Sequence, residues 1–307
     1  MKKALKRSVS VILAVAIIIG SAYAGLGALD FNSIFAIEAK AADESVLTFT
    51  LNDDGVSYSV TDCDTAAEGE LTIPAEYEGL PVTGIGNSAF FMCITLTSAA
   101  IPDSIVSIGD AAFGSSWSIS SVDISNSVVS IGSDAFSNTG IKAITIPDSV
   151  VSIGDEAFRG CSQLTSVEIG SGTTSIGDKV FRECSNLTAI NVAESNTAYV
   201  SVDGVLFNKD KTNLIKYPSN KTDTEYVIPN SVNTIETYAF QGSENITCVT
   251  ISDSVVSIDD YAFLYCTNLT SIVIPDTVTS LGERAFGECV KLVTMDVNEN
   301  NDYYSSD

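Results

Sequence analysis

The sequence predicts a repeat solenoid of the α/β class, dominated by strands, in a right-handed stack of about ten short-strand rungs. An Ala-Phe pair recurs with a period of about 23 residues, and apolar residues fall at fixed offsets after each pair. A fixed period of roughly 20–29 residues is typical of a solenoid, in which each repeat forms one rung. Such a stack offers an extended surface rather than a catalytic pocket, which favours binding or scaffolding.

The last part of each repeat is the expected strand. In the unit IPDSVVSIGDEAFRGCSQLTSVEI, the residues Leu164, Val167 and Ile169 have the spacing L-x-x-V-x-I. This spacing is the strand pattern of a leucine-rich repeat. Ser166 and Glu168 alternate with the apolar residues, so one face of the strand is expected to be buried and the other to face water.

The remainder of each repeat turns the chain back toward the next strand. Pro147 follows one strand and lacks a backbone donor, which suits a strand end. Gly154 permits a turn after an extended return. Residues 155–159 then form the expected short helical or 3₁₀ turn that carries the Ala-Phe pair. No rung buries its own apolar side, so stacked neighbours must form the core.

The recurring aromatic residue and a cysteine three residues later are expected to form a buried ladder. Other rungs carry Ser or Thr in the cysteine position, which indicates a small, tightly packed site. Disulfides between adjacent rungs stay open as an alternative for two pairs, Cys161 with Cys184 and Cys266 with Cys289. Members of the ladder are Phe90, Phe113, Phe136, Phe158, Phe181, Phe240, Phe263, Phe286, Cys161, Cys184, Cys266 and Cys289.

The combination of Ile-Pro, Ile-Gly, Ala-Phe, Cys and Leu at fixed offsets resembles the bacterial BspA-type leucine-rich repeat. The resemblance covers about Leu71 to the C-terminus and includes inserts that interrupt the repeats. It implies a surface or secreted protein that adheres to host matrix proteins, to other bacteria or to epithelium. A fold alone does not fix function, so this role is an expectation.

The N-terminal residues predict export and a cap. Residues 1–24 have a basic start, a 12-residue apolar run and an Ala-Tyr-Ala cleavage site, with a second site as late as 41. Residues 42–70 contain two alternating segments around an Asn-Asp-Asp-Gly turn, which predicts a capping β-hairpin. Regular repeats are expected in residues 71–190.

An irregular rung interrupts the repeats in residues 191–227. Its centre predicts a β-hairpin, with one strand at Val205–Phe207 and the other at Leu214–Tyr217. The hairpin is either structural or in contact with a ligand, because tyrosine and cationic side chains favour binding hot spots. Candidate contacts in this insert are Tyr199, Lys209, Lys211, Lys216 and Tyr217.

Regular repeats resume in residues 228–307 and end in a second irregular motif. Val297–Asp307 aligns with Val192–Val202 at the start of the insert. The hairpin that follows the first copy is missing after the second, which predicts a truncated repeat region that continues in a longer chain.

Composition argues against several classes of function. The chain has 15 Lys and Arg, 39 Asp and Glu and no His, for a net charge of −24. Such acidity disfavours nucleic acid and anionic lipid surfaces. Without His there is no Ser-His-Asp or Cys-His pair, and no C-x-x-C zinc signature occurs. We therefore expect no catalytic residues, no metal, no cofactor and no membrane insertion after signal removal.

Two functions remain. The first is a secreted or cell-surface binding protein that contacts an extracellular protein, from the host matrix or another cell surface, through a concave strand face. The alternative is a passive spacer that displays a downstream module. Candidate contacts on the concave face are Ser121, Asp123, Ser166, Glu168, Asn191, Ser271 and Asp296.

Overall fold

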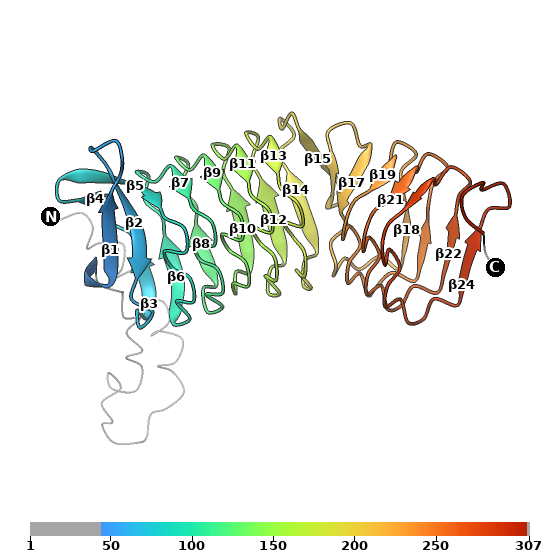
Figure 1. The fold of residues 1–307 in the computed structure, drawn as a ribbon, viewed down its shortest axis with the longest axis horizontal. Helices are drawn as coiled ribbons and strands as arrows, with labels where there is room; N and C mark the ends of the chain where they lie inside the picture. The colour runs from blue at the N-terminus through green and yellow to red at the C-terminus, as the bar shows by residue number, and fades with distance from the viewer. Residues whose placement is uncertain (1–43, 306–307) are drawn as a thin grey trace, which may run out of the picture. The chain divides into compact units, whose positions relative to one another are not determined.

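The computed structural model describes residues 44–305, all of which fall in one compact unit. The expected secretion signal, residues 1–24 with cleavage as late as 41, lies outside the described residues. In the described part the chain winds through successive rungs, and each regular rung holds a longer strand, a short strand and a turn (Figure 1). The predicted solenoid is confirmed.

The longer strand of each rung is the one that the L-x-x-V-x-I pattern predicts. The ladders between regular rungs are parallel and in register, so that Ser166 pairs with Ala189, 23 residues later. These strands form three sheets, with the orders β3-β6-β8, β10-β12-β14 and β18-β20-β22-β24. Their bounds are β3 (Gly69–Thr72), β6 (Leu96–Ala100), β8 (Ser121–Asp123), β10 (Ala143–Ile146), β12 (Ser166–Ile169), β14 (Ala189–Val192), β18 (Glu225–Val227), β20 (Cys248–Thr250), β22 (Ser271–Ile274) and β24 (Thr294–Val297).

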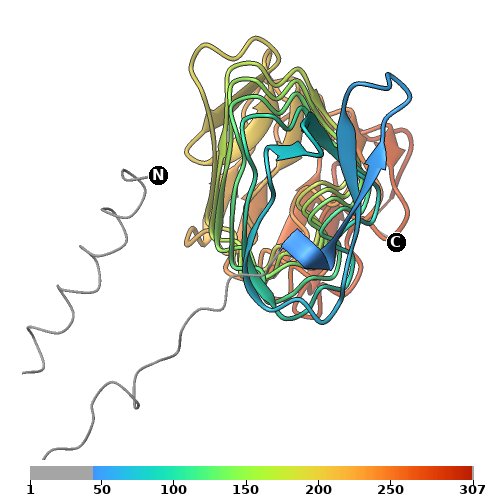
Figure 2. The ribbon, with the colours of Figure 1, turned by 90° about the vertical axis from the view of Figure 1, so that its left-hand side faces the viewer.

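A short return strand follows in each rung, where the sequence predicted extended chain. Ser152 and Ile153 pair in parallel with Ser175 and Ile176 of the next rung, for example. Successive rungs lie behind one another when the stack is viewed from its end (Figure 2). The return strands are β5 (Leu80–Ile85), β7 (Ser107–Ile108), β9 (Ser130–Ile131), β11 (Ser152–Ile153), β13 (Ser175–Ile176), β19 (Thr234–Ile235), β21 (Ser257–Ile258) and β23 (Ser280–Leu281).

The segment that carries each Ala-Phe pair is a run of tight turns, which corrects the prediction of a short helical or 3₁₀ turn. Each turn has left-handed backbone at two positions, two residues before and two residues after the Phe, as at Glu156 and Gly160 around Phe158. Helical hydrogen bonds cannot continue through such residues. The amides donate instead to the neighbouring rung, as Phe90 N does to Ala112 O. In residues 44–305 the only 3₁₀ helix is η3 (Glu44–Val46).

The repeat phenylalanines stack ring on ring along the core. Centroids of neighbouring rings lie 4.8 Å apart between Phe90 and Phe113 and 5.9 Å apart between Phe158 and Phe181. All eight are buried except Phe286, whose outward side meets no further aromatic rung in the described residues. The predicted buried ladder is therefore present, except that Phe286, at its end, is partly exposed and not buried as predicted.

The cysteine position is occupied by side chains that can donate a hydrogen bond. Cys161 Sγ lies 3.1 Å from the carbonyl oxygen of Phe136, and Cys184 Sγ lies 3.2 Å from that of Phe158. The Ser116 hydroxyl donates equivalently to Phe90 O at 2.7 Å. This shared bond explains why the site accepts Cys or Ser. All seven cysteines of the chain are free thiols in the structure.

A hairpin covers the first end of the stack, as the sequence predicts. β1 (Leu47–Leu51) pairs antiparallel with β2 (Tyr58–Cys63), and β2 in turn pairs in parallel with β5. β4 (Glu76–Tyr77) adds an antiparallel strand on β5. The Phe49 ring stacks on that of Tyr77, with 4.1 Å between centroids. These contacts cover the apolar end that a solenoid leaves open.

The insert forms an antiparallel meander of three strands, β15 (Tyr199–Val202), β16 (Val205–Asn208) and β17 (Asn213–Lys216). The predicted hairpin is present as β16 and β17. β17 then pairs in parallel with β19 and starts a new row of return strands, β17-β19-β21-β23. The earlier row ends at β13, so the insert divides the stack into two half-stacks.

Candidate functional site

The predicted concave-face residues lie on the outer face of the longer strands. Ser121 and Asp123 are on β8, Ser166 and Glu168 are on β12, and Asn191 is on β14. Their side chains are exposed or half-buried. Because the strands are stacked in register, each position forms a column that runs along the stack.

One hydrogen bond links two members of the same column. Asn191 Nδ2 donates to the Glu168 carboxylate at 2.7 Å across neighbouring rungs. An open hollow of about 360 Å³ lies beside Glu168 and is bordered by Thr145 and Asp148. Hydrogen bonds from Ser171 hold the pKa of Asp148 below its ordinary value. The first half-stack therefore presents a polar, acidic strand face.

The other two predicted residues do not join this face. Ser271 lies on β22 and Asp296 on β24, in the sheet of the second half-stack. Neighbouring positions on that sheet are apolar, with Val227 66% exposed and Val273 55% exposed. The outward strand positions predicted from the sequence thus differ in chemistry along the stack, with exposed valines beside Ser271 and Asp296 in the second half-stack.

Two of the predicted insert contacts are wrong. Tyr217 is 0% exposed and Lys216 is 4% exposed, so neither side chain can reach a partner on the surface. Tyr217 lies 23 residues before Phe240, and its ring stacks on the Phe240 ring at 4.9 Å between centroids. It fills the position of a repeat phenylalanine, which is the physical reason for its burial.

The other three candidates in the insert differ in their exposure to solvent. Tyr199 is half-buried, and its hydroxyl accepts a hydrogen bond from Ile176 N at 2.9 Å. Lys209 is exposed but its ammonium bonds the carbonyl oxygen of Asn196. Lys211 is exposed on the turn between β16 and β17. The insert is therefore mainly a structural joint, with Lys209 and Lys211 on its surface.

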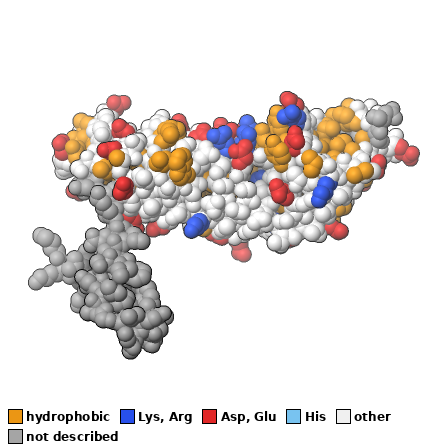
Figure 3. Space-filling view, turned by 90° about the horizontal axis from the view of Figure 1, so that it is seen from below, with side chains coloured by type: hydrophobic (Ala, Val, Ile, Leu, Met, Phe, Trp, Pro, Cys, Tyr) orange, Lys and Arg blue, Asp and Glu red, His pale blue; other side chains and the backbone are white. Residues whose placement is uncertain are grey.

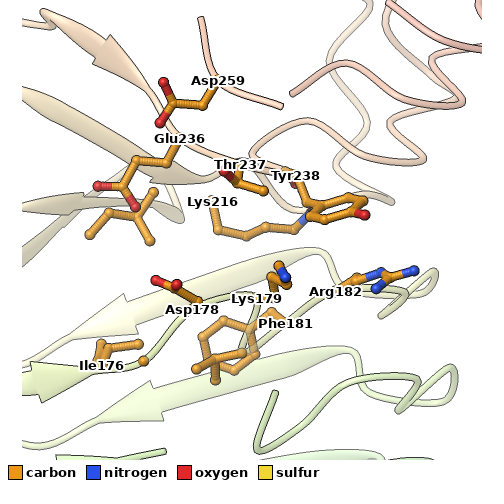
Figure 4. A pocket seen from close by; sticks show the side chains of 13 residues that line it. Ile176, Asp178, Lys179, Phe181, Arg182, Lys216, Glu236, Thr237, Tyr238 and Asp259 are labelled. Atoms are coloured by element: carbon orange, nitrogen blue, oxygen red, sulfur yellow. Dashed lines mark hydrogen bonds between the residues drawn. The ribbon is translucent and has the colours of Figure 1, made fainter. Parts of the chain in front are cut away.

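A cleft of about 340 Å³ lies where the two half-stacks meet. The turn of residues 176–182 forms one wall, and residues from β17 and the turn after β19 form the other (Figure 4). Asp178, Glu236 and Asp259 lie toward one end, and the ammonium of Lys216 lies toward the other, beside Tyr238 (Figure 4). The cleft is distinct from both strand faces.

Burial perturbs two ionisable groups of the cleft. It lowers the pKa of Lys216 to about 8, since its ammonium is desolvated. Burial also raises the pKa of Glu236, with a smaller contribution from the carboxylates of Asp259 and Asp178. Within residues 44–305, no group of three or more Cys, Asp or Glu residues has a metal-binding arrangement.

The comparison with known repeats agrees with this architecture. Residues 83–211 and 218–307 match the BspA type leucine rich repeat region, in six copies. The chain belongs to the BspA-type leucine-rich repeat family. None of the curated protein sequences compared with the chain matches it.

Solved structures of bacterial leucine-rich repeat proteins share the fold. A leucine-rich repeat protein from Eubacterium ventriosum is 26% identical, with a TM-score of 0.61 over 82% of this chain and 70% of its own. The pneumococcal vaccine antigen PcpA is 22% identical, with a TM-score of 0.61 over 83% of this chain and 80% of its own. This second likeness extends to the fold alone.

The BspA-type chain contains its irregular motif twice, as the alignment of Val297–Asp307 with Val192–Val202 predicts. In the first copy the Tyr199 hydroxyl accepts from Ile176 N at 2.9 Å, and in the second the Tyr304 hydroxyl accepts from Leu281 N at 2.9 Å. The amide of Asn196 bonds two carbonyl oxygens of the preceding rung, and that of Asn301 does the same. The motif is a structural unit of the stack.

Exposed apolar side chains on the turns were missed by the sequence reasoning. Trp117 is 57% exposed, and Phe91 and Met92 on the preceding rung are also exposed. Figure 3 shows that hydrophobic side chains gather in separate patches on one side of the BspA-type stack, with charged side chains between them. The signal was available, because Trp117 is the only tryptophan of the chain. In the described part no helix has the length and hydropathy of a membrane span.

Proposed function

We propose that this BspA-type protein is a non-enzymatic binding protein that is secreted or displayed on the cell surface, where it contacts an extracellular protein. The observation that carries the proposal is the outer strand face of the first half-stack. There Asp123, Glu168 and Asn191 are exposed at equivalent positions of stacked strands. A row of this kind suits a broad protein surface, with acidic groups that favour a partner of complementary basic charge.

Two further features support a binding role. Leucine-rich repeat proteins of this family are generally non-enzymatic, and the exposed Trp117 is of the residue type enriched in interface hot spots. Export is supported by the basic and apolar start of the chain. Cleavage after residue 24, or as late as 41, is the corresponding proposal for the mature N-terminus.

The binding experiment compares one variant of the face with one matched control. The double variant Asp123→Lys and Glu168→Lys reverses charge on the strand face, and Glu283→Lys reverses an exposed charge on a turn. Binding to a panel of purified matrix and cell-surface proteins is measured by surface plasmon resonance. Loss of at least tenfold in affinity for the double variant alone supports the proposal. Absence of saturable binding by the unchanged protein contradicts it.

A passive spacer is the second candidate. The stacking of the repeat phenylalanines within each half-stack favours it, because neighbouring rings lie 4.7–5.9 Å apart between centroids and stiffen the array. A spacer tolerates both charge reversals without loss of function in cells. The same two variants therefore distinguish the candidates when they are produced in the native host.

A further inference from the structure

The cleft between the half-stacks contains backbone N–H groups that would donate to the next rung in a regular repeat. On each regular turn the amides of the Phe and of the residue two before it donate to the next rung, as Glu156 N does to Asp178 O and Phe158 N does to Val180 O. The equivalent amides at the joint belong to Lys179 and Phe181. No hydrogen-bond partner for either amide exists among the described residues.

On the regular turns the equivalent amides point toward the next rung. At the joint the cleft lies on that side, so the amides of Lys179 and Phe181 point toward the cleft. Lys179 has a left-handed backbone conformation, with φ of 56°. Left-handed and right-handed residues therefore alternate in the turn that carries the two amides. Successive amides in such a conformation form a concave anion site. Phe181 is buried, and an unpaired amide on a buried residue is rare in folded proteins, which indicates a missing acceptor at this place.

Cationic side chains surround the same end of the cleft. Lys216 is buried, and its ammonium makes a single hydrogen bond within residues 44–305, to Tyr238 O at 3.1 Å. An ammonium has three donors, so two remain. The buried Nε of Arg182 has no hydrogen-bond partner in the part of the chain that the structure describes, while its terminal nitrogen pairs with Glu183 at 3.0 Å. Arg182 also lies over the Tyr238 ring, 4.6 Å from its centroid, which fixes the guanidinium beside the cleft.

The opposite end of the cleft is acidic. Asp178, Glu236 and Asp259 line it, and Figure 4 shows their carboxylates toward the same side. Asn213 Nδ2 donates to the Glu236 carboxylate at 2.8 Å and orients it. Like charges gathered in this way are stabilised by a cation placed among them.

We propose that the cleft binds a small zwitterion, an amino acid or a dipeptide, with its carboxylate at the amides of Lys179 and Phe181 and its ammonium at the acidic end. The carboxylate accepts bonds from Lys216 and Arg182, which supply charge-assisted donors. A volume of about 340 Å³ is in the range of small-molecule pockets. This site is separate from the proposed protein-binding face.

The test uses the full chain and dialanine as the probe, with binding measured by isothermal titration calorimetry. N-acetyl-dialanine removes the positive charge of the probe, and dialanine amide removes its negative charge. We expect each analogue to bind at least tenfold more weakly than dialanine. No binding of dialanine or alanine at millimolar concentration overturns the proposal, and so does equal binding of either analogue.

Variants locate the binding within the cleft. Lys216→Met and Glu236→Gln conserve side-chain size, and each is expected to weaken dialanine binding at least tenfold. Lys142→Met removes an exposed lysine outside the cleft and is expected to leave the affinity unchanged. Dialanine should also shift the amide resonances of Lys179 and Phe181. Unchanged affinity of Glu236→Gln together with unshifted amides would place the probe elsewhere and refute the site.

Discussion

The Tyr217 ring stacks on the Phe240 ring with 4.9 Å between centroids, and so a residue of the insert begins the aromatic ladder of the second half-stack. Its hydroxyl lies 3.3 Å from the Asp223 carboxylate, at the edge of the core. Burial raises the pKa of Tyr217, in agreement with a phenol that stays neutral in the folded protein.

The replacement Tyr217→Ala should destabilise the protein by about 3–5 kcal/mol, because it removes a fully buried ring and leaves a cavity between stacked rungs. Tyr217→Phe retains the ring and should cost only about 1 kcal/mol for the lost hydrogen bond. Urea unfolding gives both values. Tyr303→Ala, at an exposed tyrosine, is the control and should change stability by less than about 0.5 kcal/mol. Equal losses for Tyr217→Ala and Tyr303→Ala would contradict the core role.

The variant Lys216→Met should be more stable than the natural protein by about 2–3 kcal/mol at pH 7. In the folded protein Lys216 has a pKa of about 8, whereas in the unfolded chain its pKa is near 10.5, the ordinary value of a lysine. A pKa that is lower in the folded state means that burial of the charge opposes folding below pH 8. Free energies of unfolding from urea titrations measure the gain.

The pH dependence of that gain is the sharper part of the prediction. Above pH 8 the folded protein holds Lys216 neutral, so the advantage of Lys216→Met should decline and vanish near pH 10.5. The Cys184 thiol near Lys216 does not compensate the charge of the ammonium, because burial raises the pKa of this thiol and keeps it protonated. Arg182, Lys179, Asp178, Glu236 and Asp259 share the cleft. A gain that stays constant between pH 7 and pH 10 would show that lost packing, not charge, determines the effect.

Ala111→Gly should stabilise the protein by about 0.5–1 kcal/mol. Ala111 has left-handed backbone, with φ of 50°, which costs a residue with a Cβ about 1–2 kcal/mol, and glycine relieves that strain. The adjacent Ala112 is buried without positive φ, so Ala112→Gly should destabilise instead. Thermal midpoints of the two variants should move in opposite directions, and movement in the same direction would refute the strain argument.

Cys248 should be the thiol that reacts first in the folded protein. It lies on the outer face of β20 and is half-buried, while the other six cysteines are buried. One equivalent of a maleimide, followed by mass spectrometry of peptides, should modify Cys248 before any other site. In Cys248→Ser the fast reaction should disappear. Equally rapid labelling of Cys161 or Cys266 would show that the ladder opens more readily than its burial implies.

Much of the fold could be predicted because the repeat has one dominant physical requirement, an apolar side that only a neighbouring rung can cover. The offsets of Leu164, Val167 and Ile169 determine the longer strand, and the recurring Phe determines the ladder. The turn conformation could not be predicted in this way. Its left-handed positions hold Ala111, Glu156 and Tyr238 as readily as glycine, since hydrogen bonds to adjacent rungs hold the backbone there.

The candidate site was predicted less well, because solvent exposure depends on where a residue falls in the stack. Lys216 and Tyr217 belong to a lysine-containing polar insert and were interpreted as surface residues. The interval of 23 residues from Tyr217 to Phe240 was the signal for burial. The cleft had no sequence signal, since it arises where the inter-rung bonds of one half-stack end and those of the next begin.

The division at the insert also affects how the stack loses its structure. Its buried side chains form two clusters, one from Val60 to Leu206 and one from Val205 to Cys289. In repeat arrays, cooperativity passes only through contacts between neighbouring rungs. Among the described residues no ring contact joins Phe181 to Tyr217, so the aromatic ladder is broken at the joint and we expect each half-stack to unfold as a cooperative block of its own. Under heat or mechanical load one block can therefore unfold while the other keeps its native strand face.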